Sequence, residues 1–323
     1  LVVVLVRCGG QLVGAAALFR RRRGGVAVLS PVGLHVSDFS DVLLDDCVAA
    51  EAAYHLAREI VVQARGGVVD LPETPPSAAV WHLADVWPAA SWHLRSSTCL
   101  AGPAQPMEKL IDSLPSRNAG RKRRKLRQIE AQQLAVKLVD SARAAEAVND
   151  LLRLHREQWR GRGMTREHGR ARFGVFLSRA ARTMIERGEA AISEYRQDGR
   201  LVCVDLTLLG HDLAGGYLAG IDPRLRQRVD VTALLLRQNL DLACQFGRST
   251  LSLLRGAEEH KLGWRPVVTA NRRLLLAGTP AVTARAYAEL VRARSRLVDL
   301  LGSRLPKAHR LLHRMKAWLP SFT

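Results

Sequence analysis

The chain has 323 residues, 47% of them hydrophobic and 24% charged, a composition that excludes disorder throughout and is long enough for two domains. Its 49 Lys and Arg against 30 Asp and Glu give a net charge of +19, which predicts attraction to nucleic acid, acidic lipid or phosphorylated cofactors. Apolar runs such as Leu1 to Val6 are far shorter than the roughly 18 to 20 residues of a membrane-spanning helix. Five widely spaced cysteines without a C-x-x-C pair argue against a disulfide framework or zinc cluster and favour a reducing cytosol.

The first part of the chain predicts three strands, a helix and a further strand. Their expected ranges are 1–7, 11–19, 26–32, 46–64 and 68–71. Clustered Pro and Gly predict breaks at 71–76, 101–106 and 278–280. We expect the second break to be an inter-domain linker.

The second part predicts the order β-α-α-β-β-β-α-β-β. The expected ranges are 134–139, 141–159, 168–187, 190–196, 200–209, 213–220, 230–247, 250–254 and 267–276. In the strand 200–209 one face is wholly apolar, while the other carries Asp205. A carboxylate on a central strand is a candidate functional group.

An internal repeat links the two parts. Gly10-Gln-Leu-Val13 and Gly199-Arg-Leu-Val202 lie 189 residues apart, and each stands between two predicted strands of a meander. The chain therefore contains two copies of one unit. The first copy has no counterpart of the opening strand and helix pair, so we expect a first half that is truncated at its N-terminus.

The element order resembles the GNAT (GCN5-related N-acetyltransferase) fold, and the doubled unit resembles the CelD/BcsL-type acetyltransferases associated with cellulose biosynthesis, distant relatives of the Fem-type transferases. The segments that carry this resemblance are the basic helix Ser116 to Arg127 before strand 134–139, the stretch Leu154 to Trp159 with Gly161 and Gly163, and Leu253-Leu-Arg-Gly256 followed by Glu258, Lys261 and Trp264. The resemblance implies an α+β fold with two GNAT-like halves, each a largely antiparallel mixed sheet flanked by helices. The expected domains are 1–105, 106–280 and a basic helical tail, 281–323.

The resemblance also implies acetyl-CoA as acyl donor and no metal. The family's R/Q-x-x-G-x-G/A loop should precede the helix that begins near Asp230, but this sequence has Arg224 to Thr232 there, without glycine. Glycine lets phosphates approach the backbone, and a helix N-terminus attracts them. We expect the pyrophosphate to contact the side chains of Arg224, Arg226, Gln227 and Arg228 and the amides of Val231 and Thr232; a solvated basic loop is the alternative.

Acyl transfer needs a base for the acceptor and an acid for the leaving thiolate. Where the last two meander strands separate in the GNAT fold, the resemblance offers Asp205 or Glu194 as base and Tyr217 as acid. The alternative for Asp205 is a buried carboxylate bonded to a neighbouring strand or arginine, and for Tyr217 it is packing.

An acid, bases and aromatic side chains together are typical of a substrate pocket. The expected substrate-binding residues are Trp159, Glu258, His260, Lys261 and Trp264. A surface turn with one buried Trp is equally consistent with the last four. His309 and His313 are spaced i, i+4 but have no acidic or Cys partner nearby, so we assign them no metal.

Two basic segments remain, 117–127 and 281–319. The first is a solvated linker helix or contacts a polyanion or acidic membrane surface; the second docks on the protein body or lies on such a membrane. Nucleic-acid binding would rest on charge alone, because only 5% of the residues are aromatic.

The leading hypothesis is a bacterial, cytoplasmic acyltransferase, or one at the inner membrane face, that moves acetyl from acetyl-CoA to an amine or hydroxyl on a sugar, peptide or envelope precursor. The alternatives are a non-catalytic basic protein that binds a polyanion or anionic membrane, and a Fem-like transferase that uses aminoacyl-tRNA.

Overall fold

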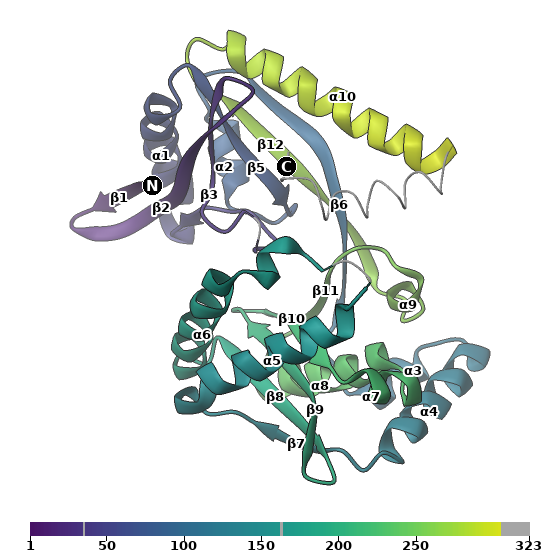
Figure 1. Ribbon diagram of the computed structural model, residues 1–323. Coiled ribbons are helices and arrows are strands. Elements are labelled where there is room, and N and C mark those ends of the chain that lie inside the picture. The colour runs from purple at the N-terminus through teal and green to yellow at the C-terminus, as the bar shows by residue number, and fades with distance from the viewer. Residues whose placement is uncertain (35, 162–163, 305–323) are drawn as a thin grey trace. The chain divides into compact units, whose positions relative to one another are not determined.

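The structure is a computed structural model that describes residues 1–304 except 35 and 162–163 (Figure 1). Gly163, the end of the basic tail, His309 and His313 lie outside the described residues. The described chain forms two compact units: residues 1–98 with 269–304 make the first, and residues 99–268 make the second. Strands β6 (Ser91–Pro103) and β12 (Val267–Ala277) carry the chain from one unit into the other.

The first unit is a mixed sheet in the order β1-β2-β3-β5-β12-β6. Strands β3 and β5 are parallel, and β5 pairs antiparallel with β12. Its further elements are β1 (Val2–Cys8), β2 (Gln11–Arg23), β3 (Val26–Pro31), β4 (Leu43–Leu44), a 3-10 turn (Asp46–Val48), α1 (Ala49–Gln63), β5 (Gly67–Thr74), α2 (Val80–Asp85) and α10 (Val282–Arg304).

Alternation along its strands explains how this sheet is covered. Leu29 and Val69 pack with α1 and α2, whereas their neighbours Val28 and Val68 pack with α10. Successive side chains of a strand point to opposite faces, so helices cover both faces of β3 and β5. The predicted alternative in which the helical tail docks on the protein is thus confirmed for its described part.

The second unit is a sheet in the order β6-β11-β10-β9-β8-β7. All its pairs are antiparallel except the parallel pair β10 and β11. Its elements are α3 (Met107–Asp112), α4 (Ser116–Glu130), β7 (Ala135–Leu138), a 3-10 turn (Ser141–Arg143), α5 (Ala144–Trp159), a 3-10 turn (Arg166–Gly169), α6 (Ala171–Glu186), β8 (Ala190–Gln197), β9 (Arg200–Leu209), β10 (Leu213–Ile221), α7 (Pro223–Arg228), α8 (Val231–Gln245), β11 (Thr250–Arg255) and α9 (Glu259–Leu262).

Helices α5 and α8 cover opposite faces of the second sheet. A Cβ on Gly220 would lie 2.2 Å from the Leu151 carbonyl oxygen of α5, and one on Gly216 would lie 2.6 Å from Nδ2 of Asn239 in α8. Glycine at 220 therefore lets α5 approach β10 closely. The predicted order of long elements is confirmed from β7 to β11, but the last predicted strand, β12, pairs with β5 in the sheet of the first unit instead of closing the second sheet. The α+β fold class with GNAT-like halves is confirmed.

The structure also confirms the internal repeat. The pairing of β1 with β2 shifts register between Val6 and Arg7, and that of β8 with β9 shifts between Tyr195 and Arg196, the same 189 residues further on. Helices α1 and α8 each have 15 residues, and each is followed by a strand that lies parallel to the last strand of its meander.

The expected break at 101–106 is wrong in its first half. Residues Ala101 to Pro103 belong to β6, where they pair with Thr250 to Ser252. Pro103 has no N–H to donate to the ladder, and β6 ends at this residue. None of the helices between residues 1 and 304 that the structure describes is long and apolar enough to cross a membrane.

Candidate active site

A cavity of about 640 Å³ lies in the second unit, where β10 and β11 separate. The two strands pair only from Leu213 to Gly215 with Thr250 to Ser252. The cavity is lined by β10, β11, the end of α5, the start of α8 and the α9 segment. The expected site residues that line it are Trp159, Asp205, Tyr217, Arg226, Val231, Thr232, Glu258, His260 and Lys261.

A β-bulge places Tyr217 at this opening. Gly216 pairs with Thr207 and Leu218 with Leu206, so Tyr217 is the extra residue on β10. A bulge bends its strand and re-aims the side chain. Tyr217 is half-buried in the cavity wall.

Asp205 is the buried acid of the cavity. Its side chain is 1% exposed, and Oδ2 has no hydrogen-bond partner among the described residues. Burial raises the pKa of this carboxyl to about 7, while a hydrogen bond from Asn239 opposes the rise. Such a group exchanges a proton near neutral pH, as a general base must.

Asn239 is a site residue that the sequence did not single out. It lies on the buried side of α8, bonds to Asp205 and accepts a hydrogen bond from the Thr207 hydroxyl. Thr207 stands two residues from Asp205 on the same face of β9. The amide therefore fixes the carboxylate from the helix side.

His155 also lines the cavity, although the sequence analysis did not single it out. Its Nδ1 lies 2.9 Å from the Ala219 carbonyl oxygen and donates to it, and its Nε2 lies 3.4 Å from Nδ1 of His168. Burial lowers the pKa of His155, which leaves the ring neutral. Nearby, Oε1 of Gln158 is buried and has no partner within the described part of the chain.

The arginine-rich segment before α8 is the short helix α7 rather than a turn. Asp222 caps it by accepting from the Arg224 amide at 2.7 Å, and Pro223 follows as its first residue, a combination that starts helices. Only Arg226 lines the main cavity; Arg224 and Arg228 line a separate cavity of about 330 Å³ with Arg200. Gln227 lines neither.

The first turn of α8 borders the cavity. Asp230 accepts from the Ala233 amide at 2.9 Å and contacts Lys125 Nζ, which compensates the carboxylate charge. Val231 and Thr232 line the cavity in the first helical turn, where N–H groups have no partner within the helix.

Glu194 lies outside the cavity, which corrects its expected position. It pairs across the ladder with Val204, the residue before Asp205, and so projects from the other face of the sheet. Its side chain is 2% exposed and forms ion pairs of 3.1 Å with Arg143 and Arg196.

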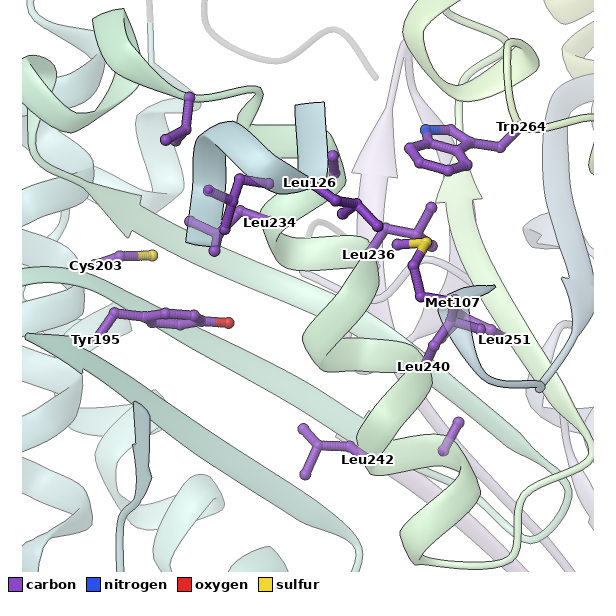
Figure 2. Packing of buried hydrophobic residues seen from close by; sticks show 14 of the residues in the cluster. Met107, Leu126, Tyr195, Cys203, Leu234, Leu236, Leu240, Leu242, Leu251 and Trp264 are labelled. Carbon is purple, nitrogen blue, oxygen red and sulfur yellow. The ribbon is translucent and has the colours of Figure 1, made fainter. Parts of the chain in front are cut away.

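Three of the four substrate-binding residues expected in and around α9 line the cavity, and the fourth does not. Glu258, His260 and Lys261 line the cavity, and Lys261 Nζ lies 2.9 Å from the Glu258 carboxylate. Trp264, by contrast, is buried in the core cluster that Figure 2 shows, with Lys122 Nζ 3.6 Å from its ring centre. Burial lowers the pKa of Lys122 to about 8, with a further contribution from Lys125.

The second unit has a GNAT-like fold. Residues 116–262 match the family model of the acetyltransferase (GNAT) domain. Within the described residues, no group of His, Cys, Asp and Glu could hold a metal ion.

Solved structures show the same fold over most of the chain. FemX is 10% identical with a TM-score of 0.62, covering 88% of this chain and 89% of its own. L-PGS from Bacillus licheniformis is 10% identical with a TM-score of 0.55, covering 84% and 82%. The C-terminal DUF2156 domain of a protein from Agrobacterium fabrum is 10% identical with a TM-score of 0.56, covering 86% and 85%. No curated protein sequence matches the chain.

Proposed function

We propose that the second unit is an acyltransferase that moves acetyl from acetyl-CoA to an amine or hydroxyl. The observation that carries this proposal is the buried carboxylate of Asp205, one oxygen of which has no hydrogen-bond partner among the described residues. It lies in a cavity that opens where β10 and β11 separate, within the segment that matches the GNAT domain. Its pKa of about 7 suits proton transfer at neutral pH.

The residues present fit a diphosphate-bearing donor. Arg226 supplies a positive charge in the cavity, and the amides of Val231 and Thr232 add first-turn donors and the helix dipole. Bound acetyl-CoA would supply an activated acyl group as its thioester. Arg224 and Arg228 have no part in this site, because they line the other cavity.

The side chains then have distinct tasks. Asp205, held by Asn239, accepts the proton that the attacking amine or hydroxyl loses as it bonds to the acyl carbon. Tyr217 donates a proton to the sulfur as the carbon–sulfur bond breaks. Trp159, His260 and Lys261, with Glu258 beside it, line the remaining wall and are proposed to hold the acceptor.

The CelD/BcsL resemblance supports a sugar, peptide or envelope precursor as acceptor, and a cytoplasmic or inner-membrane-face location. The structural similarity to FemX extends over most of the chain. The second candidate function is therefore a Fem-like transferase that uses aminoacyl-tRNA as its donor. The basic segments 117–127 and 281–319 and the net charge of +19 of the whole chain suit that donor, or an anionic surface if the protein is not catalytic.

Calorimetric titration with acetyl-CoA tests the donor. We expect binding in the micromolar range that Arg226→Gln weakens about 10- to 100-fold, since a hydrogen bond to a charged group contributes about 1.5–3 kcal/mol. Arg224→Gln removes the same charge from the other cavity and should leave affinity within about twofold. If acetyl-CoA gives no heat at millimolar concentration and aminoacyl-tRNA binds in a salt-sensitive way, the donor is aminoacyl-tRNA and not acetyl-CoA.

A further inference from the structure

A cavity of about 370 Å³ lies in the first unit, between β1, β2 and α1. Val4, Val6 and Val13 line it from the strands, and Ala52 lines it from the helix. Val4, Val13 and Ala52 are buried, and Val6 packs against the core of the unit. Part of the hydrophobic core of the first unit therefore faces an open cavity and has no helix over it.

The corresponding surface of the second unit is covered by α4. The register shifts align the strands of the two units, and the ends of α1 and α8 align the helices. In this alignment the counterparts of Val6, Val13 and Ala52 are Tyr195, Val202 and Leu234. These counterparts share one core cluster with the apolar residues of α4, which are Ala119, Leu126 and Ile129. The repeat thus places a helix in the second unit where the first unit has a cavity.

The strand β1 offers a second open position beside the cavity. It lies at the edge of the first sheet, as Figure 1 shows, and no described strand pairs with its outer side. Its counterpart β8 pairs with β7 on that side, and β7 follows α4 after only four residues, 131–134. An edge strand presents unpaired N–H and C=O groups to which another strand can add. A helix followed closely by a strand would therefore fill both positions.

The helix side of the cavity carries negative charge. Glu51, His55 and Glu59 line it from α1, where a spacing of four residues places them on one face of the helix. Glu59 accepts a hydrogen bond from Gln63 at 2.9 Å, but neither glutamate forms an ion pair with any residue in the described part of the chain. On the strand side Arg7 adds one positive charge. The two carboxylates favour a basic partner and would repel an anionic lipid surface.

We propose that this cavity and the free edge of β1 bind a segment of another protein, a basic amphipathic helix followed by a short β-strand. The apolar stripe of that helix fills the cavity, and its Lys or Arg side chains pair with Glu51 and Glu59. The strand adds to the first sheet beside β1, which gives main-chain hydrogen bonds. A second copy of this chain does not supply the helix from its own α4, because the apolar face of α4 is buried in its own core.

A labelled synthetic peptide of residues 113–139, which holds α4 and β7, is the probe for a titration by fluorescence anisotropy. Peptide and protein are both positively charged, so overall charge opposes binding. We expect saturable binding that Glu51→Gln and Glu59→Gln each weaken about threefold and together about 10-fold. Asp85→Asn removes an exposed acid of α2 in the same unit and should leave affinity within about twofold. The shorter peptide 113–131, without the strand, should bind at least about 10-fold more weakly.

Cys8 provides a readout at the site itself, because its thiol is exposed and lines the cavity. Cys47→Ser and Cys244→Ser first remove the other exposed cysteines. Saturating peptide should then slow alkylation of Cys8 by iodoacetamide at least about 10-fold, since reactivity depends on access. No binding at millimolar peptide, an unprotected Cys8, or an equal loss with Asp85→Asn would overturn the proposal. So would sedimentation that shows a dimer in the absence of peptide which the two Glu→Gln changes dissociate, because the occupant would then be a second copy.

Discussion

The two units repeat one fold but differ at the position of the candidate site. The 189-residue repeat of the strands places Ala16 and Leu18 of β2 where β9 has Asp205 and Thr207, and the equal helices place Ala57 where α8 has Asn239. All three residues of the first unit are buried and apolar or small. The backbone geometry is therefore kept without the polar network.

The strands that border this position differ too. In the second unit β10 passes its bulge at Tyr217 and continues to pair with β9 as far as Ile221. In the first unit β3 ends at Pro31, and the separate strand β4 takes up the pairing with Gly14 and Ala15 of β2. The bulge in β10 of the second unit thus corresponds, in the first unit, to a loop between β3 and β4.

The third difference is the set of residues that α4 contacts. In the second unit Lys125 and Glu130 of α4 contact Asp230 and Arg237, and Gln132, two residues after the end of α4, contacts Gln197. The counterparts of the three contacted residues line a cavity of about 370 Å³ in the first unit; they are Val48, His55 and Cys8. The repeat therefore supplies a scaffold twice, while the polar network and the helix on its flank belong to the second copy among the described residues.

Asp205→Asn should give the largest effect in this comparison. We expect turnover to fall about 10²- to 10⁴-fold, the usual contribution of a general base. The free energy of unfolding, by contrast, should be higher for Asp205→Asn than for the parent protein. Burial raises the pKa of Asp205 from 3.8 to about 7, so the folded protein prefers the neutral acid and loses stability as pH rises from about 4 through 7. At pH 8 that loss is about 4 kcal/mol.

Denaturant unfolding of both proteins between pH 4 and 8 measures this directly. The gain from Asp205→Asn should be near zero at pH 4 and largest at pH 8. A variant that keeps full turnover, or a gain that does not depend on pH, would contradict the role of Asp205 as a buried base.

Ala16→Asp makes the reciprocal change in the first unit. A carboxylate at this buried position would have Ala57 where Asp205 has Asn239, so we expect a loss of about 3 kcal/mol at pH 8 and a smaller loss at pH 5, where the acid is neutral. Ala16→Asn adds similar volume without a titratable group and serves as the control. Equal pH dependence of the two variants would show that the counterpart position is not apolar and dry.

Local patterns were sufficient for most of the fold. Strand 200–209 was predicted with its observed bounds, because Val202, Val204 and Leu206 alternate with a mixed face. The start of α7 carried its own signal, the Asp222-Pro223 pair, which the search for a glycine loop overlooked. Strand β6 runs into a Gly-Pro sequence because pairing with β11, about 150 residues away, supports it.

The site was predicted less completely, since its partners are distant in sequence. Asp205 stood out as an acid on a central strand, but Asn239 reaches it from another element. His155 lines the cavity because α5 packs on β10, where its Nδ1 donates to the Ala219 carbonyl oxygen. Glu194 and Asp205 look alike in the sequence. Their separation into opposite faces follows from the ladder register.

Gly216→Ala should give the smallest effect and sharpens the comparison at the bulge. Its Cβ would lie 2.6 Å from Nδ2 of Asn239, so the amide must move away from Asp205. We expect about 1–2 kcal/mol of destabilisation from this overpacking. Turnover should fall more than substrate affinity, and the pH at which activity is half-maximal should rise, because the displaced amide no longer lowers the pKa of Asp205. Gly102→Ala is the matched control: it lies in β6 of the same unit, and its Cβ would meet nothing within 4 Å. A normal pH profile for Gly216→Ala at reduced stability would limit Asn239 to a packing role.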